Sequence, residues 1–226
     1  LSDMRLLRVL AAASAAALLA QPSAAQAGRQ FKDAWFWGAK GGALVYSSNY
    51  STDNAVAPLA GIDWMITRTY GGLYVSVDES FFSSQGSFKE VGLSGLQDRV
   101  VDLNNLQRIS AAIVGFPMQS PNLHPYVGLG MGMNRIGSVG STAPFDNQAQ
   151  LYAAADSVQN KRVAFAPFVL LGAQQRLPMF SVFVQGTGTF LHNEFFLHNP
   201  RPKLGIQYTL EAGVRYNVGK SIDRAR

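Results

Sequence analysis

The segment 203–219, KLGIQYTLEAGVRYNVG, constrains the fold of this chain more than any other. Apolar residues from Leu204 to Val218 occupy every second position, and the positions between them are mostly polar or glycine. Side chains of a β-strand point alternately to opposite faces, so the pattern predicts one strand with an apolar and a polar face. Strands in soluble sheets are usually about 5–6 residues long. A much longer strand with one apolar and one charged face is typical of a barrel wall that faces lipid.

The N-terminal region reads as an export signal. Arg5 and Arg8 precede the apolar run 9–20, and Ala25-Gln26-Ala27 forms an A-x-A cleavage site. The run is shorter than the roughly 20 apolar residues that a spanning helix needs, which argues against an uncleaved anchor. We therefore expect residues 1–27 to be a cleaved signal peptide, residues 28–219 to form one barrel domain, and residues 220–226 to be a short periplasmic tail.

The amino-acid composition of the chain excludes several classes of function. The chain has no cysteine, which excludes thiolate metal sites and cysteine nucleophiles. Its net charge of +5 is scattered rather than clustered, so no nucleic-acid-binding surface is expected. The most apolar stretch after the signal, 163–173, is interrupted by proline and glycine and is too short for a transmembrane helix. A β protein is the remaining expectation.

Alternation, aromatic and β-branched residues and flanking turn signals predict eight strands. They are 35–47, 58–67, 71–82, 102–116, 124–136, 162–176, 179–191 and 203–219. The connections alternate between short ones, near 68–70, 117–123 and 177–178, and long ones at 48–57, 83–101, 137–161 and 192–202. Short periplasmic turns and longer external loops alternate in this way in outer-membrane barrels. The sequence thus predicts an all-β, eight-stranded antiparallel transmembrane up-and-down barrel.

With its signal peptide, strand count and alternating connections, the chain resembles the small eight-stranded outer-membrane barrels of the OmpA-barrel and OmpX type. The last strand is also similar to the C-terminal assembly pattern of that family, carried here by Glu211, Gly213, Tyr216 and Val218. The chain departs from many members by continuing past this pattern with GKSIDRAR. The resemblance implies a Gram-negative outer-membrane location, insertion by the barrel assembly machinery, and contact with outer-membrane lipids and lipopolysaccharide.

Several charged residues fall on the inward face of the predicted barrel. An eight-stranded barrel is only wide enough for side chains to fill it, and buried charges are costly unless they are paired. We therefore expect a network that plugs the lumen, with Glu211 against Arg108 or Lys40 and Arg215 against Asp63 or Asp78. A narrow, gated channel is the open alternative.

The last long connection holds a candidate external binding loop. Its residues are His192, Glu194, Phe195, Phe196, His198 and Arg201. Aromatics beside cations predict either contact with lipopolysaccharide or a partner, or anchoring of the rings at the membrane interface. The spacing of the two histidines and the glutamate matches no known metal signature, so neither a metal nor a cofactor is expected.

One further loop, 137–161, contains a predicted short helix over 147–158. Leu151, Ala154, Ala155 and Val158 lie on one stripe of that helix, so we expect this stripe to cover the barrel mouth or to bind a partner.

The sequence favours a non-enzymatic outer-membrane barrel with a structural, adhesive or envelope-protective role. Two alternatives remain: a conduit for small or apolar solutes, and a lipid A-modifying enzyme. The enzyme alternative needs a nucleophile or paired carboxylates with a histidine at the outer rim. The nearest motif, His192-Asn193-Glu194, lacks the serine expected of a deacylase.

Overall fold

The computed structural model describes residues 33–51, 53–92, 95–118, 120, 122–141, 148–177, 180–191, 195–198 and 205–220. The predicted signal peptide, 1–27, lies outside these residues. So does the predicted tail, 220–226, apart from Lys220.

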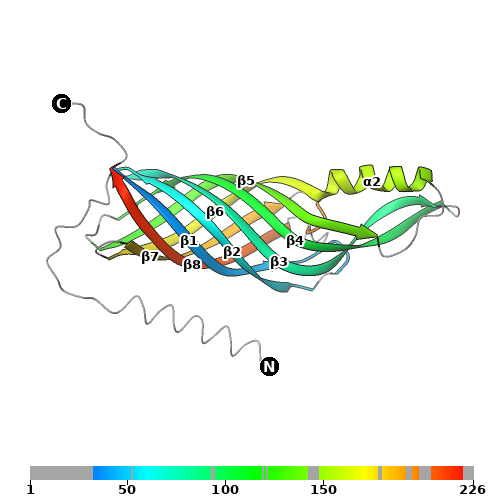
Figure 1. Ribbon diagram of the computed structural model, residues 1–226, viewed down its shortest axis with the longest axis horizontal. Coiled ribbons are helices and arrows are strands. Elements are labelled where there is room, and N and C mark those ends of the chain that lie inside the picture. Colours follow the sequence, from blue (N-terminus) through cyan, green and yellow to red (C-terminus); the bar gives the residue numbers. More distant parts are fainter. Residues whose placement is uncertain are drawn as a thin grey trace, which may run out of the picture.

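Eight antiparallel strands pair in sequence order and close into one barrel (Figure 1). The expected up-and-down topology is therefore confirmed. The strands are β1 (Ala34–Tyr46), β2 (Ala55–Thr67), β3 (Gly71–Gly92), β4 (Gly95–Gly115), β5 (Leu123–Ser141), β6 (Val163–Arg176), β7 (Phe180–Leu191) and β8 (Gly205–Lys220).

Pairing between the first and last strands closes the barrel. It runs from Ala34↔Lys220 to Val45↔Tyr208, with one irregularity between Trp35 and Phe36. Closure leaves neither strand with a free edge, and free edges are sites for aggregation. The last strand, with its apolar and polar faces, therefore pairs with a neighbouring strand along each of its two edges.

The outer wall of the barrel is apolar, whereas its charged residues on β8 face the interior. On β8, the outward Tyr208, Leu210 and Val214 are 46–57% exposed, whereas the inward Glu211 and Arg215 are 1% and 0% exposed. The same arrangement holds on other strands, where outward Ile113 and Phe165 are 76% and 68% exposed. This distribution is the reverse of that in a water-soluble domain, and it confirms the face assignment made for the last strand.

The β3–β4 hairpin is longer than the sequence pattern predicts. Residues 83–101 were expected to be a loop, but pairing continues from Ser84↔Leu103 to Gly92↔Gly95 after a register shift near Ser80. The loop prediction is wrong because the hairpin has its own apolar face. On it, Phe88, Val101 and Leu103 are at most 4% exposed. The serines and glycine of SSQGS concealed this face in the sequence.

The predicted helix is present as α2 (Gln148–Arg162), which packs against β3, β5 and β6. The predicted apolar stripe of this helix is correct for two of its four residues. Ala154 is buried in an apolar cluster and Val158 packs against that cluster, but Leu151 is 44% exposed and Ala155 is also exposed. Among the described residues, no helix has both the length and the apolar character needed to cross a bilayer.

Beyond one end of the barrel lie α2 and the extended hairpin, opposite the end where β1 begins and β8 finishes (Figure 1). We call residues 84–92 and 95–100, α2 and the turn 195–198 the external cap. The cap is joined to the barrel by one continuous cluster of buried apolar side chains, described below.

Two adjacent glycines of β1 provide a test of barrel closure. A Cβ at Gly42 would lie 2.1 Å from the Leu210 carbonyl oxygen of β8, whereas a Cβ at Gly41 would meet its nearest atom at 3.7 Å. We expect Gly42→Ala to lower the free energy of unfolding by about 1–3 kcal/mol, because the backbone of β8 must shift. Gly41→Ala should change it by less than about 0.5 kcal/mol. Urea unfolding in detergent micelles measures both, and equal effects would contradict the register of closure.

Candidate functional site in the lumen

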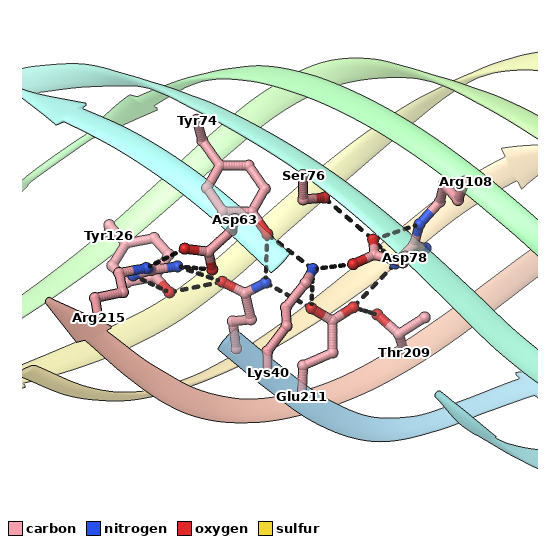
Figure 2. A network of polar contacts seen from close by, with 11 residues as sticks. Lys40, Asp63, Tyr74, Ser76, Asp78, Arg108, Tyr126, Thr209, Glu211 and Arg215 are labelled. Atoms are coloured by element: carbon pink, nitrogen blue, oxygen red, sulfur yellow. Dashed lines mark hydrogen bonds and ion pairs between the residues drawn. The ribbon is translucent and has the colours of Figure 1, made fainter. Parts of the chain in front are cut away.

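The six charged residues assigned to the lumen from the sequence all lie there, between 0% and 6% exposed. Each occupies an inward position in the alternation of its strand, which is why the sequence places them together. They are Lys40 on β1, Asp63 on β2, Asp78 on β3, Arg108 on β4, and Glu211 and Arg215 on β8. Figure 2 shows these side chains meeting across the barrel.

Four of the six form a ring of alternating charge. Lys40 Nζ lies 2.7 Å from both Asp78 Oδ1 and Glu211 Oε2. Arg108 completes the ring, with a guanidinium nitrogen 3.1 Å from Asp78 Oδ2 and 2.9 Å from Glu211 Oε1. Each cation therefore contacts both carboxylates, and Glu211 pairs with both of the cations considered for it. Such mutual pairing is what makes burial of charge tolerable.

Arg215 and Asp63 form a second, bidentate pair. Arg215 donates from Nε to Asp63 Oδ1 and from a terminal nitrogen to Oδ2, both at 3.0 Å. Its other terminal nitrogen donates to Gln174 Oε1 at 2.8 Å, and the guanidinium lies 3.7 Å from the centroid of the Phe183 ring. Two parallel charge-assisted bonds and a ring contact hold this fully buried cation in one orientation.

Neutral side chains link the ring to the pair (Figure 2). The Tyr74 hydroxyl accepts from Lys40 Nζ at 3.0 Å and from Gln185 Nε2 at 2.9 Å. Gln185 Oε1 accepts from the Tyr126 hydroxyl at 2.8 Å and from Arg215 at 3.2 Å. Sequence reasoning did not single out Tyr74 or Tyr126, although both fall on inward positions. We call the six charged residues with Tyr74, Tyr126 and Gln185 the lumen network.

Apolar clusters bound the lumen network at both ends. The cluster nearer the described ends of β1 and β8, which we call the terminal cluster, comprises Ala34, Phe36, Met65, Ala112, Val114, Phe116, Phe168 and Leu170, together with the rings of Tyr74 and Tyr126, whose hydroxyls belong to the lumen network. On the opposite side, under the external cap, the cap cluster includes Leu44, Tyr46, Phe88, Leu103, Leu106, Ile136, Leu191 and the turn residues Phe195, Phe196 and Leu197. The described lumen is therefore layered as apolar, charged and apolar.

This layering explains why β6 is apolar on both faces. Its inward residues Ala164 and Ala166 belong to the cap cluster, and Phe168 and Leu170 belong to the terminal cluster. Its outward residues, such as Phe165 and Leu171, are exposed on the wall. In this strand only Gln174, near its end, reaches the lumen network.

The candidate external binding loop is not exposed where it is described. Phe195 and Phe196 are 2% and 0% exposed, and His198 is 2% exposed. The Phe196 carbonyl accepts from the Asn49 backbone N–H at 2.8 Å. The prediction that Phe195 and Phe196 meet lipopolysaccharide, a partner or the membrane interface is therefore wrong, because their apolar rings fill the barrel mouth.

The remaining loop candidates, His192, Glu194 and Arg201, lie outside the described residues. Within the described part of the chain, no group of three or more histidine, aspartate or glutamate side chains is placed to hold a metal ion.

The residues of the assembly pattern occupy both faces of β8. Glu211 belongs to the lumen network, whereas Tyr216 and Val218 lie outward at 47% and 48% exposure. Gly213 sits close to β1, where a Cβ would lie 2.3 Å from the Ala39 carbonyl oxygen. These positions are compatible with recognition of β8 from outside the barrel, and an assembly role for this strand stays a prediction.

Comparison with known proteins supports the fold assigned to this chain. No protein family model and no curated protein matches this chain. Among solved structures, Neisserial surface protein A (NspA) superposes with a TM-score of 0.50 at 14% identity, covering 80% of this chain and 96% of that one. The N-terminal β-barrel domain of Pseudomonas aeruginosa OprF gives 0.44 at 14% identity (83% and 99% covered), and Ail of Yersinia pestis gives 0.42 at 11% (81% and 99% covered). The similarity to NspA and the closed eight-stranded topology confirm the expected fold resemblance to small outer-membrane barrels.

Breaking the buried pair should be costly. Arg215→Met leaves Asp63 buried without its cation, and we expect a loss of about 3–5 kcal/mol in the free energy of unfolding. Lys89→Met is the matched control, because Lys89 pairs with Asp98 at 3.3 Å but both side chains are more than 60% exposed. It should cost less than about 1 kcal/mol. Urea unfolding of both variants in micelles gives the comparison. Similar losses in the free energy of unfolding would contradict the claim that the Arg215–Asp63 pair stabilises the barrel more than a surface pair does.

Removing the buried aromatic side chain of Phe196 should destabilise the cap cluster. We expect Phe196→Ala to cost about 3–5 kcal/mol, because a fully buried ring is lost from a packed site. Tyr50→Ala, a nearby aromatic that is 53% exposed, serves as the control and should cost little. Thermal unfolding followed by near-ultraviolet circular dichroism checks this. A harmless Phe196→Ala would mean that the turn does not seal the barrel.

Proposed function

We propose that this protein is an outer-membrane barrel with a closed, non-conducting lumen, and that its role is structural, adhesive or protective for the envelope. The observation that carries the proposal is the layered lumen. Charged side chains pair across it, and an apolar cluster seals it on each side.

Membrane placement is supported by the outer wall. On this wall Trp35 and Trp37 pack against Trp64, with ring centroids 5.7 and 6.3 Å apart. They lie near the ends of β1 and β2 that are furthest from the external cap. Tryptophan favours the boundary between lipid and water, so we assign this cluster to the periplasmic interface. The exposed apolar residues of β8 and β5 then face the bilayer core.

Charge balance in the lumen supports non-conduction. Lys40, Arg108 and Arg215 are matched by Asp63, Asp78 and Glu211, each within 3.1 Å of a partner of opposite sign. A matched set has no net charge to draw an ion in, unlike the single-sign rings that line selective pores. An ion would have to break several of these contacts to pass.

The external cap supports an adhesive or protective role. Its helix α2 and the β3–β4 hairpin project beyond the barrel rim (Figure 1), and α2 presents Leu151 and Tyr152 at 44% and 66% exposure. It is also held firmly, since Asn49 bonds Ser87 through both side-chain atoms, at 2.6 and 2.9 Å. A rigid projection with exposed apolar and aromatic groups suits a surface that meets other molecules outside the cell.

Fractionation tests the location. We expect the exported protein to pellet with outer membranes, to require detergent for extraction, and to migrate faster on gels before boiling than after it. A compact, detergent-resistant barrel retains its shape in the unheated sample. A protein that is soluble without detergent and unchanged by boiling would refute the membrane assignment.

Planar-bilayer recording tests closure of the lumen. We expect the purified barrel to insert without discrete conductance steps, because the lumen network and both apolar clusters occlude the path. Insertion is verified in the same preparation by protease protection in vesicles. Reproducible single-channel steps from wild-type protein would overturn the closed-lumen proposal in favour of the narrow channel.

A further inference from the structure

Three cations lie together on the outside of the barrel, where α2 joins β6. Arg135 is exposed on the outward face of β5, and its cross-strand neighbour on β6 is Val163. Lys161 and Arg162 are the last two residues of α2, directly precede Val163 and are partly exposed. We call Arg135, Lys161 and Arg162 the rim cations, because all three belong to the junction of β5, α2 and β6.

The rim cations differ from six other described cations in having no carboxylate partner. The six that pair with an aspartate or glutamate are Lys40, Arg68, Lys89, Arg99, Arg108 and Arg215. Within the described part of the chain, no carboxylate forms an ion pair with a rim cation. Arg162 donates instead to the backbone carbonyl oxygens of Ile136, at 2.7 Å, and of Gly137. Carbonyl groups carry no net charge, so the junction stays positive.

The acidic groups on the neighbouring elements do not cancel this charge. Glu79 on β3 lies in the same cross-strand row as Arg135 but is separated from it by Gln107 on β4. Its carboxylate accepts a hydrogen bond from the Asn105 side chain at 3.3 Å. Asp156 on α2 is exposed and precedes Lys161 by more than one helical turn. The excess of positive charge is therefore local to the junction.

The rim cations lie at the level where the apolar part of the wall ends. The outward residues of β5 on the terminal side of Arg135 are uncharged: Val127, Leu129, Met131 and Met133. The ladder between β6 and β7 begins only at Phe168↔Thr189, so among the described residues 163–167 pair in the sheet with β5 alone. Hydrocarbon does not tolerate a strand edge with unpaired backbone groups, whereas water and lipid headgroups satisfy one. This edge places the rim cations at headgroup level.

An exposed apolar surface adjoins the rim cations on the side of the bilayer core. Phe165 on β6 is 68% exposed, and its cross-strand neighbour on β5 is Met133. Leu129 and Met131 extend this surface along β5, at 67% and 54% exposure. Positive charge beside an apolar surface matches a lipid whose headgroup is anionic and whose acyl chains lie below it.

We propose that the rim cations bind a phosphate group of an outer-leaflet lipid, and that the acyl chains of this lipid lie along Phe165 and Met131. Arg135 suits this role because a guanidinium can donate two parallel hydrogen bonds to a phosphate, and Lys161 adds a second charge. The inference rests on the membrane placement given under Proposed function. It deepens that function by assigning the lipid chemistry that one part of the wall recognises.

Native mass spectrometry with two matched lipids tests the site. The exported barrel is equilibrated in neutral detergent micelles with lipid A or with dephosphorylated lipid A, which carries the same acyl chains. We expect the wild-type barrel to retain lipid A and to retain the dephosphorylated form several-fold less. Arg135→Gln and Lys161→Gln should each weaken retention of lipid A about fivefold, because each removes one basic group from beside the anionic headgroup.

Lys89→Gln is the matched control. Lys89 is also an exposed cation, but it lies on the β3–β4 hairpin of the external cap and pairs with Asp98. This variant should retain lipid A as the wild type does. Inorganic phosphate added in excess should not displace the lipid, because a free anion makes no contact with the apolar surface around Phe165.

Equal retention of the two lipids by the wild type would overturn the proposal, and so would an equal loss in Lys89→Gln or displacement of lipid A by inorganic phosphate. Heat-modifiability measured on the same samples reports whether each barrel is folded. A folded barrel without preference for the phosphorylated lipid counts against the rim site alone. A protein that is soluble without detergent and unchanged by heating counts against the membrane assignment.

Discussion

Charge compensation inside the barrel is the interaction on which the rest of the structure depends. The lumen network, together with Gln174, connects side chains from all eight strands. These are Lys40, Asp63, Tyr74, Asp78, Arg108, Tyr126, Gln174, Gln185, Glu211 and Arg215. A strand that shifted by one residue would turn its polar member outward and leave the partner buried and unpaired. The lumen network therefore specifies strand register as well as filling the lumen.

The apolar wall follows from the same period of two. Positions between the inward polar residues must face outward, and there they are Leu210, Val214 and their equivalents on other strands. In water such a surface would aggregate, whereas in lipid it is the favourable one. The barrel is thus stable only where its surroundings are apolar, and its interior holds a charged layer between two apolar clusters.

The alternation of residues along each strand predicted which side chains face outward and which face the lumen, and the reason is physical. The face of a residue in a strand depends only on its position in the alternation, so Arg108 and Glu211 could be assigned inward, on opposite walls, from sequence. Apart from α2, the cap could not be predicted in this way. Ser84 and Gly86 read as loop residues, and Phe196 lies in a segment rich in polar and charged residues. Their structures depend on contacts with distant segments, such as Asn49 with Ser87 and with Phe196.

The most direct measurement of the central claim is a spin-label scan of β8 in lipid vesicles, which is practical because the chain has no cysteine of its own. Single cysteines introduced from 206 to 218 would carry the label. An apolar wall around a closed lumen predicts collision rates with dissolved oxygen that alternate with a period of two, high at Leu210 and Val214 and low at Gln207 and Thr209. Gly213 is left unlabelled, because a Cβ there would meet the Ala39 carbonyl oxygen. A polar relaxation agent should reach neither set. Uniform accessibility along the strand, or free access of the polar agent to inward positions, would contradict the account.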